Sequence, residues 1–178
     1  DQVHESDEFE ANYETFGMNP GACPKRFVAS SDAWDYFSEE GVGKSKRLSG
    51  IEQHELLSKI ITPKDLGHIL KGEEPAIKNL LTERVLSKPQ WFSSSLKVIN
   101  ETSIIDPFGF IHRPDRVIID SEGNVSIIDF KFGEELEEHK NQVNRYIRLY
   151  KDMGYDTVSG FVWYIPSDKV VETILDPL

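Results

Sequence analysis

The sequence predicts an α/β domain with a mixed central sheet, and three observations lead to this fold class. Apolar residues recur at helical spacing in the first half of the chain. The period then changes to short runs rich in Val, Ile, Phe and Trp, which are typical of strands. One long helical segment separates the later runs. The expected order is therefore helices, three strands, a helix and one or two further strands.

The elements can be assigned in chain order. Helices are predicted over 27–40, 50–61, 65–70 and 74–86. Strands are predicted over 96–105, 113–119, 125–132 and 158–165, with a final strand over 170–174. The long helix spans 134–153 and ends at Gly154, because glycine after the last periodic residue commonly terminates a helix.

Composition limits the class of protein. A chain of 178 residues with 38% hydrophobic content suits one globular domain with its own core. No apolar run approaches the roughly 18 residues of a membrane span, so no membrane association is expected. Cys23 is the only cysteine and cannot form an internal disulfide, which fits a reducing cytoplasm. The sequence begins at Asp1 rather than Met, and we expect it to be an internal fragment.

The charge is negative and unevenly distributed. The formal net charge is −11, which argues against a domain that grips nucleic acid by itself, because phosphate binding needs Lys and Arg. Residues 1–20 contain acidic residues but no Lys or Arg. We therefore expect an acidic, loosely ordered lead-in over 1–30 and a folded domain over 31–178.

A predicted β-hairpin over 113–132 carries the most informative residues. The segment 120–124 is a turn between two apolar runs. If Ile119 pairs with Val125, Asp115 falls opposite Asp129, on the same face and about 5 Å away. Lys131, two residues further along the strand, shares that face. The hairpin thus brings two carboxylates and an ammonium group together.

Two such carboxylates repel each other unless something compensates their charge. A hard divalent cation such as Mg²⁺ does so, and the neighbouring Lys131 then orients a water or stabilises charge on a phosphoryl group. The alternative is a structural salt bridge within the strands, in which Asp115 or Asp129 pairs with Lys131 or Arg116.

Four further residues are candidates for the same site. His54 lies on the apolar stripe of its helix and faces inward, as a ligand or as a hydrogen-bonded core histidine. Glu101 belongs to the strand before the hairpin and faces the cleft or the solvent. Gln142 and Tyr146 are one turn apart on the long helix and share one of its faces.

Together these residues resemble the RecB-type branch of the PD-(D/E)XK nucleases, found at the C-terminal end of AddA-like and UvrD/Rep-like helicase–nucleases. The resemblance runs from about residue 36 to 174. It rests on this ordered set: Gly50-x-x-x-His54, Glu101, Pro114-Asp115, Asp129-Phe130-Lys131 and Gln142-x-x-x-Tyr146.

The resemblance implies a restriction-endonuclease-like core of order αβββαβ, preceded by helices. It implies Mg²⁺ or Mn²⁺ as cofactor, held by His54, Asp115, Asp129 and the Phe130 carbonyl. It makes Lys131 the catalytic lysine, with Asp115, Asp129 and Glu101 in the catalytic set. Gln142 and Tyr146 would line the DNA path.

The resemblance also implies the biological setting. The expected substrate is a single DNA strand, cut exonucleolytically after delivery by upstream helicase domains of the same chain. A second helicase–nuclease subunit is a further expected partner, and double-strand-break repair is the expected process. The alternative is a non-catalytic DNA-tracking or scaffolding domain with the same fold.

Two cofactors are not expected. Some relatives bind an iron–sulfur cluster through four cysteines, whereas this chain has only Cys23. The segment 41–45 ends like a phosphate-binding loop, but Ser38 stands where that pattern requires glycine. We therefore expect no ATP site in this fragment.

Overall fold

The computed structural model describes residues 43–173 and 175, with side chains from residue 50 onward. The predicted lead-in over 1–30 and the predicted helix over 27–40 lie outside these residues. The helical elements are α2 (Gly43–Lys59), the short 3₁₀ helix η2 (Pro63–Asp65), α3 (Leu66–Ile69), α4 (Pro75–Ser87) and α5 (Glu137–Asp152). The strands are β1 (Lys97–Asn100), β2 (Ile104–Ile105), β3 (Ile111–His112), β4 (Arg116–Ile119), β5 (Val125–Lys131), β6 (Val158–Tyr164) and β7 (Lys169–Thr173).

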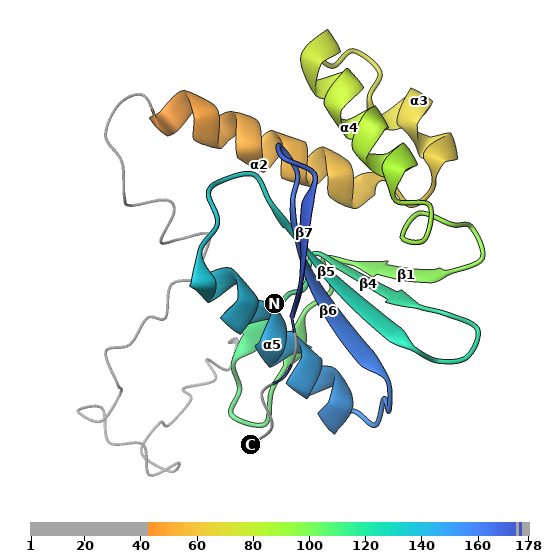
Figure 1. Ribbon diagram of the computed structural model, residues 1–178, viewed down its shortest axis with the longest axis vertical. Helices are drawn as coiled ribbons and strands as arrows, with labels where there is room; N and C mark the ends of the chain where they lie inside the picture. The colour runs from red at the N-terminus through yellow and green to blue at the C-terminus, as the bar shows by residue number, and fades with distance from the viewer. Residues whose placement is uncertain (1–42, 174, 176–178) are drawn as a thin grey trace, which may run out of the picture. The chain divides into compact units, whose positions relative to one another are not determined.

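The main sheet has five strands in the order β1-β4-β5-β6-β7. The pair β5–β6 is parallel, because α5 connects the two strands, and the other pairs are antiparallel. Helices, then β1, β4 and β5, then α5 and β6 give the order αβββαβ that was expected of a restriction-endonuclease-like core (Figure 1). The predicted fold class, an α/β domain with a mixed central sheet, is confirmed.

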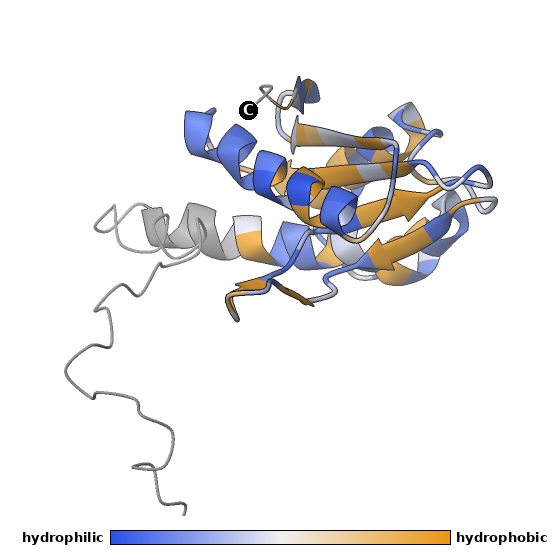
Figure 2. Ribbon diagram, turned by 90° about the horizontal axis from the view of Figure 1, so that it is seen from below, coloured by the Kyte–Doolittle hydropathy of each residue, from blue (hydrophilic) through white to orange (hydrophobic). Residues whose placement is uncertain are grey.

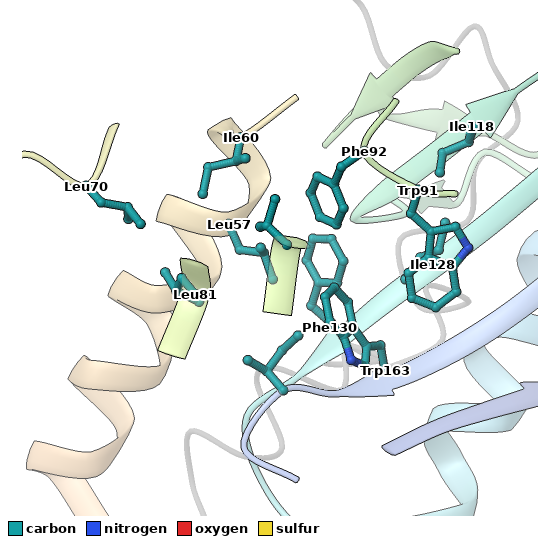
Figure 3. Close-up of a cluster of buried hydrophobic side chains, with 12 residues drawn as sticks. Leu57, Ile60, Leu70, Leu81, Trp91, Phe92, Ile118, Ile128, Phe130 and Trp163 are labelled. Atoms are coloured by element: carbon teal, nitrogen blue, oxygen red, sulfur yellow. The ribbon is translucent and has the colours of Figure 1, made fainter. Parts of the chain in front are cut away.

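Helices cover both faces of this sheet. The long helix α5 lies on one face, and α2, α3 and α4 lie on the other (Figure 1). Alternate residues of β5 serve the two faces: Ile128 and Phe130 pack with α2 and α4, whereas Val125 and Ile127 pack with α5. Figure 3 shows the aromatic centre of the α2/α4 side, where the rings of Phe130 and Trp163 meet edge-to-face with centroids 5.9 Å apart.

A strip of buried apolar residues fixes α5 on its face of the sheet. Val143, Tyr146, Ile147 and Tyr150 recur at helical spacing and are all buried. Gly160 of β6 lies beneath them, and an added Cβ at this position would clash with the side chains of Val143 and Ile147. The glycine therefore lets the helix approach the sheet closely.

One region differs from the sequence prediction. The predicted strand over 96–105 is divided into β1 and β2, because Glu101 takes a left-handed backbone conformation with φ of 50°. Residues 104–112 form a separate two-stranded sheet, the β2–β3 hairpin, which was not predicted. β4 accordingly begins at Arg116 rather than at residue 113.

The other boundaries shift by up to three residues, except the start of α2. α2 extends upstream to Gly43, beyond the predicted start at residue 50.

Among the described residues, no helix combines the length and apolar character that crossing a membrane requires.

Candidate metal centre

The β4–β5 hairpin places the two aspartates near each other at one end of the sheet. Its register pairs Ile119 with Val125 and ends at Arg116 opposite Ile128, as predicted. Asp115 is the next residue beyond this ladder, and its Oδ2 accepts a hydrogen bond of 2.6 Å from the Phe130 amide. The carboxylate of Asp115 therefore lies against the backbone between Asp129 and Lys131.

His54 and Glu101 meet Asp115 at this end of the sheet. Nε2 of His54 lies 3.0 Å from Oδ2 of Asp115, and Nδ1 lies 3.5 Å from Oε1 of Glu101. The imidazole also packs edge-on against the rings of Phe130 and Phe132, with centroids 5.9 Å and 6.4 Å away. These contacts hold the ring between an aromatic wall and two carboxylates.

Several contacts position Glu101. Its amide donates a hydrogen bond of 3.1 Å to the carbonyl of Asp115, and its Oε2 lies 2.9 Å from Nε of Arg113. The left-handed conformation of Glu101 is costly for a residue with a side chain, and such strain tends to collect at functional sites. Next to it, the side chain of Asn100 donates to the Ser58 carbonyl, which ties β1 to the helix that carries His54.

Asp129 and Lys131 form a buried ion pair. Nζ of Lys131 lies 3.0 Å from Oδ2 of Asp129, and both side chains are buried on the α5 face. Nζ also donates a hydrogen bond of 3.3 Å to Oε1 of Gln142. Burying such charges is less costly when they are paired with each other. The salt bridge considered from the sequence is therefore present between these two residues, whereas Arg116 does not take part in it.

Gln142 and Tyr146 extend this network along α5. Nε2 of Gln142 donates a hydrogen bond of 2.8 Å to the Tyr146 hydroxyl, which in turn donates to the Arg113 carbonyl at 3.4 Å. Burial, reinforced by the negative charge of Asp129, raises the pKa of Tyr146, so the phenol stays protonated and can donate. The residue is only 4% exposed, so a base can stack on the ring only if the side chain moves. The expectation that both residues line a DNA path stays a prediction.

The cluster of His54, Glu101 and Asp115 fits a divalent cation. Each residue offers one ligand atom, and these atoms all lie within 4.8 Å of one another. The 3.0 Å between Nε2 and Oδ2 matches the spacing of about 3 Å between adjacent ligands around a cation with bonds of about 2.1 Å. One imidazole with carboxylates is a donor set that suits Mn²⁺ as well as Mg²⁺.

Asp129 and the Phe130 carbonyl lie beside this cluster, although neither is among the three grouped residues. In a strand, the N–H and C=O of one residue point to the same edge. Because the Phe130 amide faces Asp115, its carbonyl is directed to that side as well. The ligand roles of Asp129 and the Phe130 carbonyl remain predictions.

Arg113 was not recognised as a contributor from the sequence, and Arg116 was considered only as a salt-bridge partner of Asp115 or Asp129. Arg113 contacts Glu101 and accepts a hydrogen bond from Tyr146 through its carbonyl, and its position next to Pro114-Asp115 was the available signal. Arg116 is fully buried on the opposite face and donates to the carbonyls of Ile60, Ile61 and Trp91. No periodic pattern distinguishes such an arginine from an exposed one.

Comparison with known proteins gave only distant likeness. No family model and no curated protein matches the chain. One similar solved structure is a repair endonuclease from Pyrococcus abyssi, with 22% identity over 52% of this chain and 38% of that chain, at a TM-score of 0.36. Another is an EndoMS complex with double-stranded DNA, with 20% identity over 48% of this chain and 34% of that chain, at a TM-score of 0.34. Scores at this level are too low to carry a functional assignment.

Proposed function

We propose that this domain is a DNA nuclease that hydrolyses phosphodiester bonds with the help of Mg²⁺ or Mn²⁺. The observation that carries the proposal is the convergence of His54, Glu101 and Asp115, with ligand atoms within 4.8 Å of one another, beside the buried Lys131–Asp129 pair. A lysine next to a carboxylate-rich cation site is the combination that phosphoryl chemistry needs, because charge grows on the phosphate oxygens during the reaction.

Each residue has a role in this proposal. His54, Glu101 and Asp115 would hold the cation, and Asp129 and the Phe130 carbonyl would complete its ligands, as the family resemblance implies. The cation would bind phosphate oxygens and lower the pKa of a bound water. Lys131, held by Asp129 and Gln142, would direct its ammonium protons to the attacking water or to the phosphate.

The finer assignment rests on the family resemblance and on charge. We propose an exonuclease that acts on a single strand delivered by attached helicase domains during double-strand-break repair in the cytoplasm. A net charge of −11 opposes binding of the DNA phosphates, so this chain alone should bind DNA weakly. Tethering to a motor would compensate, because it raises the local DNA concentration to about the millimolar range. Comparing this chain with the helicase-linked protein on the same strand tests this point: equal cleavage rates and equal affinities would contradict it.

The central test is the replacement of one ligand and of the lysine. Asp115→Ala should abolish cleavage of single-stranded DNA and weaken Mn²⁺ binding. Lys131→Ala should lower cleavage by about 10²–10³-fold while metal binding is largely kept. Cleavage is measured on a labelled strand, and Mn²⁺ affinity by calorimetry.

Glu122→Ala provides the matched control, since Glu122 is an exposed carboxylate in the turn of the same hairpin. It should change neither quantity. Unchanged Mn²⁺ affinity in Asp115→Ala would refute the ligand assignment. A wild-type chain that shows no thermal shift with Mn²⁺ would favour the non-catalytic scaffold instead.

His54 separates a metal ligand from a core histidine. Imidazole nitrogen favours Mn²⁺ over Mg²⁺ in the usual order of divalent affinities. His54→Ala should therefore reduce the ratio of Mn²⁺ to Mg²⁺ affinity. If the variant loses thermal stability while both affinities stay unchanged, His54 is a packing residue.

A further inference from the structure

The β2–β3 hairpin exposes an unusual number of large apolar side chains. Four such residues lie within seven positions: Ile105 is 70% exposed, Phe108 85%, Phe110 58% and Ile111 69%. Figure 2 shows the two short strands in orange, projecting from the rest of the α/β domain. A contiguous exposed apolar surface of this kind usually marks a binding site.

The two sides of the hairpin differ. Ile104 pairs with His112, and this pair faces the domain: Ile104 packs on the core cluster beneath α5, and the His112 ring lies 6.4 Å from that of Tyr146. Ile105 pairs with Ile111, and both point outward. The inward side fixes the hairpin to the domain, so the outward side is presented in a defined orientation.

The tip is held in one conformation by Asp106. Its Oδ1 accepts hydrogen bonds of 2.9 Å from the amides of Phe108 and Phe110, and its Oδ2 lies 3.0 Å from Nε2 of His112. The His112 hydrogen bond, together with those amides, lowers the pKa of Asp106, so its carboxylate stays ionised at neutral pH. The backbone that carries the two phenylalanines is therefore held before anything binds, which limits the entropy cost of ordering the tip.

The base of the hairpin coincides with the candidate metal centre. Glu101 precedes it and Arg113 follows it, and their side chains are 2.9 Å apart. Phe108 is five residues from Arg113, which is at most about 18 Å of extended chain. A strand whose phosphodiester lies at the metal centre can therefore reach the exposed phenylalanines within a few nucleotides.

The chemistry of the hairpin indicates which part of a strand it contacts. Residues 102–112 contain no Lys or Arg, and Asp106 is occupied by internal hydrogen bonds. The tip therefore suits the flat faces of bases and not phosphates. Arg113, with a side chain that is 60% exposed, places positive charge at the base of the hairpin, where phosphates would lie.

We propose that the β2–β3 hairpin is a base-stacking element, in which Phe108 and Phe110 hold unpaired bases of a single strand next to the metal centre. The proposal rests on the proposed nuclease function for its choice of nucleic acid over a protein partner. Aromatic side chains bind unpaired bases with little dependence on sequence, because every base has a π-face.

The test compares variants that keep or remove the rings. Phe108→Leu with Phe110→Leu keeps an apolar tip without rings, and Phe108→Trp with Phe110→Trp enlarges the rings. Leu86→Ala is the matched control, because Leu86 is 57% exposed on α4, away from the hairpin. Binding of the full chain to a labelled oligothymidine, and to an abasic strand of equal length, is measured by fluorescence anisotropy in EDTA at low salt.

The Leu pair should weaken oligothymidine binding at least tenfold, since stacking on two rings is lost. The Trp pair should bind as well as the wild type or better, and Leu86→Ala should match the wild type. The wild type should prefer oligothymidine to the abasic strand, and the Leu pair should lose this preference. The tip is exposed, so all variants should keep the wild-type melting temperature.

Three results would overturn the proposal. The first is equal oligothymidine binding by the Leu pair and the wild type. The second is no wild-type binding at about 100 µM, the weak end of non-specific DNA affinity. The third is self-association of the wild type in sedimentation that Phe108→Asp removes without change in DNA binding, which would assign the hairpin to a protein interface.

Omitting metal keeps this result separate from the nuclease proposal, because cleavage does not contribute to the signal. If the Leu pair loses binding but the wild type never cleaves, stacking stands and the nuclease proposal falls. If Asp115→Ala abolishes cleavage but the Leu pair binds normally, the nuclease proposal stands and the stacking proposal falls.

Discussion

The two faces of the central sheet receive alternate residues from the same strand. On the face covered by α2 and α4, β5 contributes Ile128 and Phe130 to a cluster of aliphatic and aromatic side chains (Figure 3). On the face covered by α5, it contributes Ile127 and then Asp129 and Lys131, which form a buried ion pair. The backbone is shared, so the difference lies entirely in the side chains.

Each face holds buried charge in a different way. On the α2/α4 face, Arg116 donates to the carbonyls of Ile60, Ile61 and Trp91 and lies over the Phe92 ring at 4.2 Å. Burial lowers the pKa of Arg116 to about 10, which still leaves the guanidinium charged at neutral pH.

Arg116 therefore joins the segment that follows α2 and the Trp91 loop to β4, and serves packing. Asp129 and Lys131 pair with each other within β5, and Lys131 also donates to Gln142 of α5. Because buried ion pairs are poor stabilisers, we expect the Asp129–Lys131 pair to serve chemistry at the end of the sheet where His54 of α2 meets Asp115.

The largest expected effect compares how much stability Mn²⁺ adds to a variant on each face of the sheet. Ile128→Ala should lower the free energy of unfolding by about 2–5 kcal/mol through lost packing. Lys131→Ala should lower it by about 3–5 kcal/mol, because Asp129 is left charged and buried. Mn²⁺ should stabilise both variants, because both keep the proposed metal ligands. It should stabilise Lys131→Ala more than Ile128→Ala, since a cation near Asp129 replaces the missing ammonium charge. Urea unfolding of each variant with Mn²⁺ and with EDTA measures these free energies. Equal stabilisation of the two variants by Mn²⁺ would contradict the assignment of Asp129 as a metal ligand.

A smaller effect should separate two arginines on either side of Asp115. Arg116→Met keeps the apolar stem but removes the donors to backbone carbonyls, and should cost about 1–3 kcal/mol. Arg113→Met removes an exposed ion pair with Glu101, worth about 0–1 kcal/mol. Urea unfolding in EDTA should show this order. The reverse order would mean that Arg113, and not Arg116, is the structural residue.

The smallest effect concerns the hydroxyl of Tyr146. Tyr146→Phe should cost about 1 kcal/mol near neutral pH, where its hydrogen bonds to Gln142 and Arg113 are lost. The pKa of Tyr146 is raised by burial above its ordinary value of 10.0. Above pH 10 the unfolded state ionises first, so wild-type stability should fall as the pH rises.

Tyr146→Phe should lose less stability over the same pH range. Part of the fall should remain, because burial also raises the pKa of Tyr150 and Tyr164. Urea unfolding on either side of pH 10 checks this; identical slopes in variant and wild type would show that Tyr146 ionises without leaving the fold.

The register of the β4–β5 hairpin was determined by the sequence alone. Two apolar runs around a tight turn leave few alternatives, because a shift by one residue would move every buried side chain to the other face. Ile119 therefore pairs with Val125, and Asp115, Asp129 and Lys131 follow by position. The long helix and its apolar stripe were predictable for the same reason, since a strong period of 3.6 residues has one structural interpretation.

Only the tertiary structure decided how these residues meet others. His54 and Glu101 are distant from Asp115 in sequence, and their convergence depends on how α2 packs on the sheet and on the left-handed backbone at Glu101. The direction of Arg116 and the β2–β3 hairpin depend on the same packing, because a side chain on a strand or in a short loop takes its partner from whichever segment covers it. Local periodicity contains no information about that segment. Long-range contacts depend on which apolar faces of the helices and strands pack together, and that is decided by the fold as a whole.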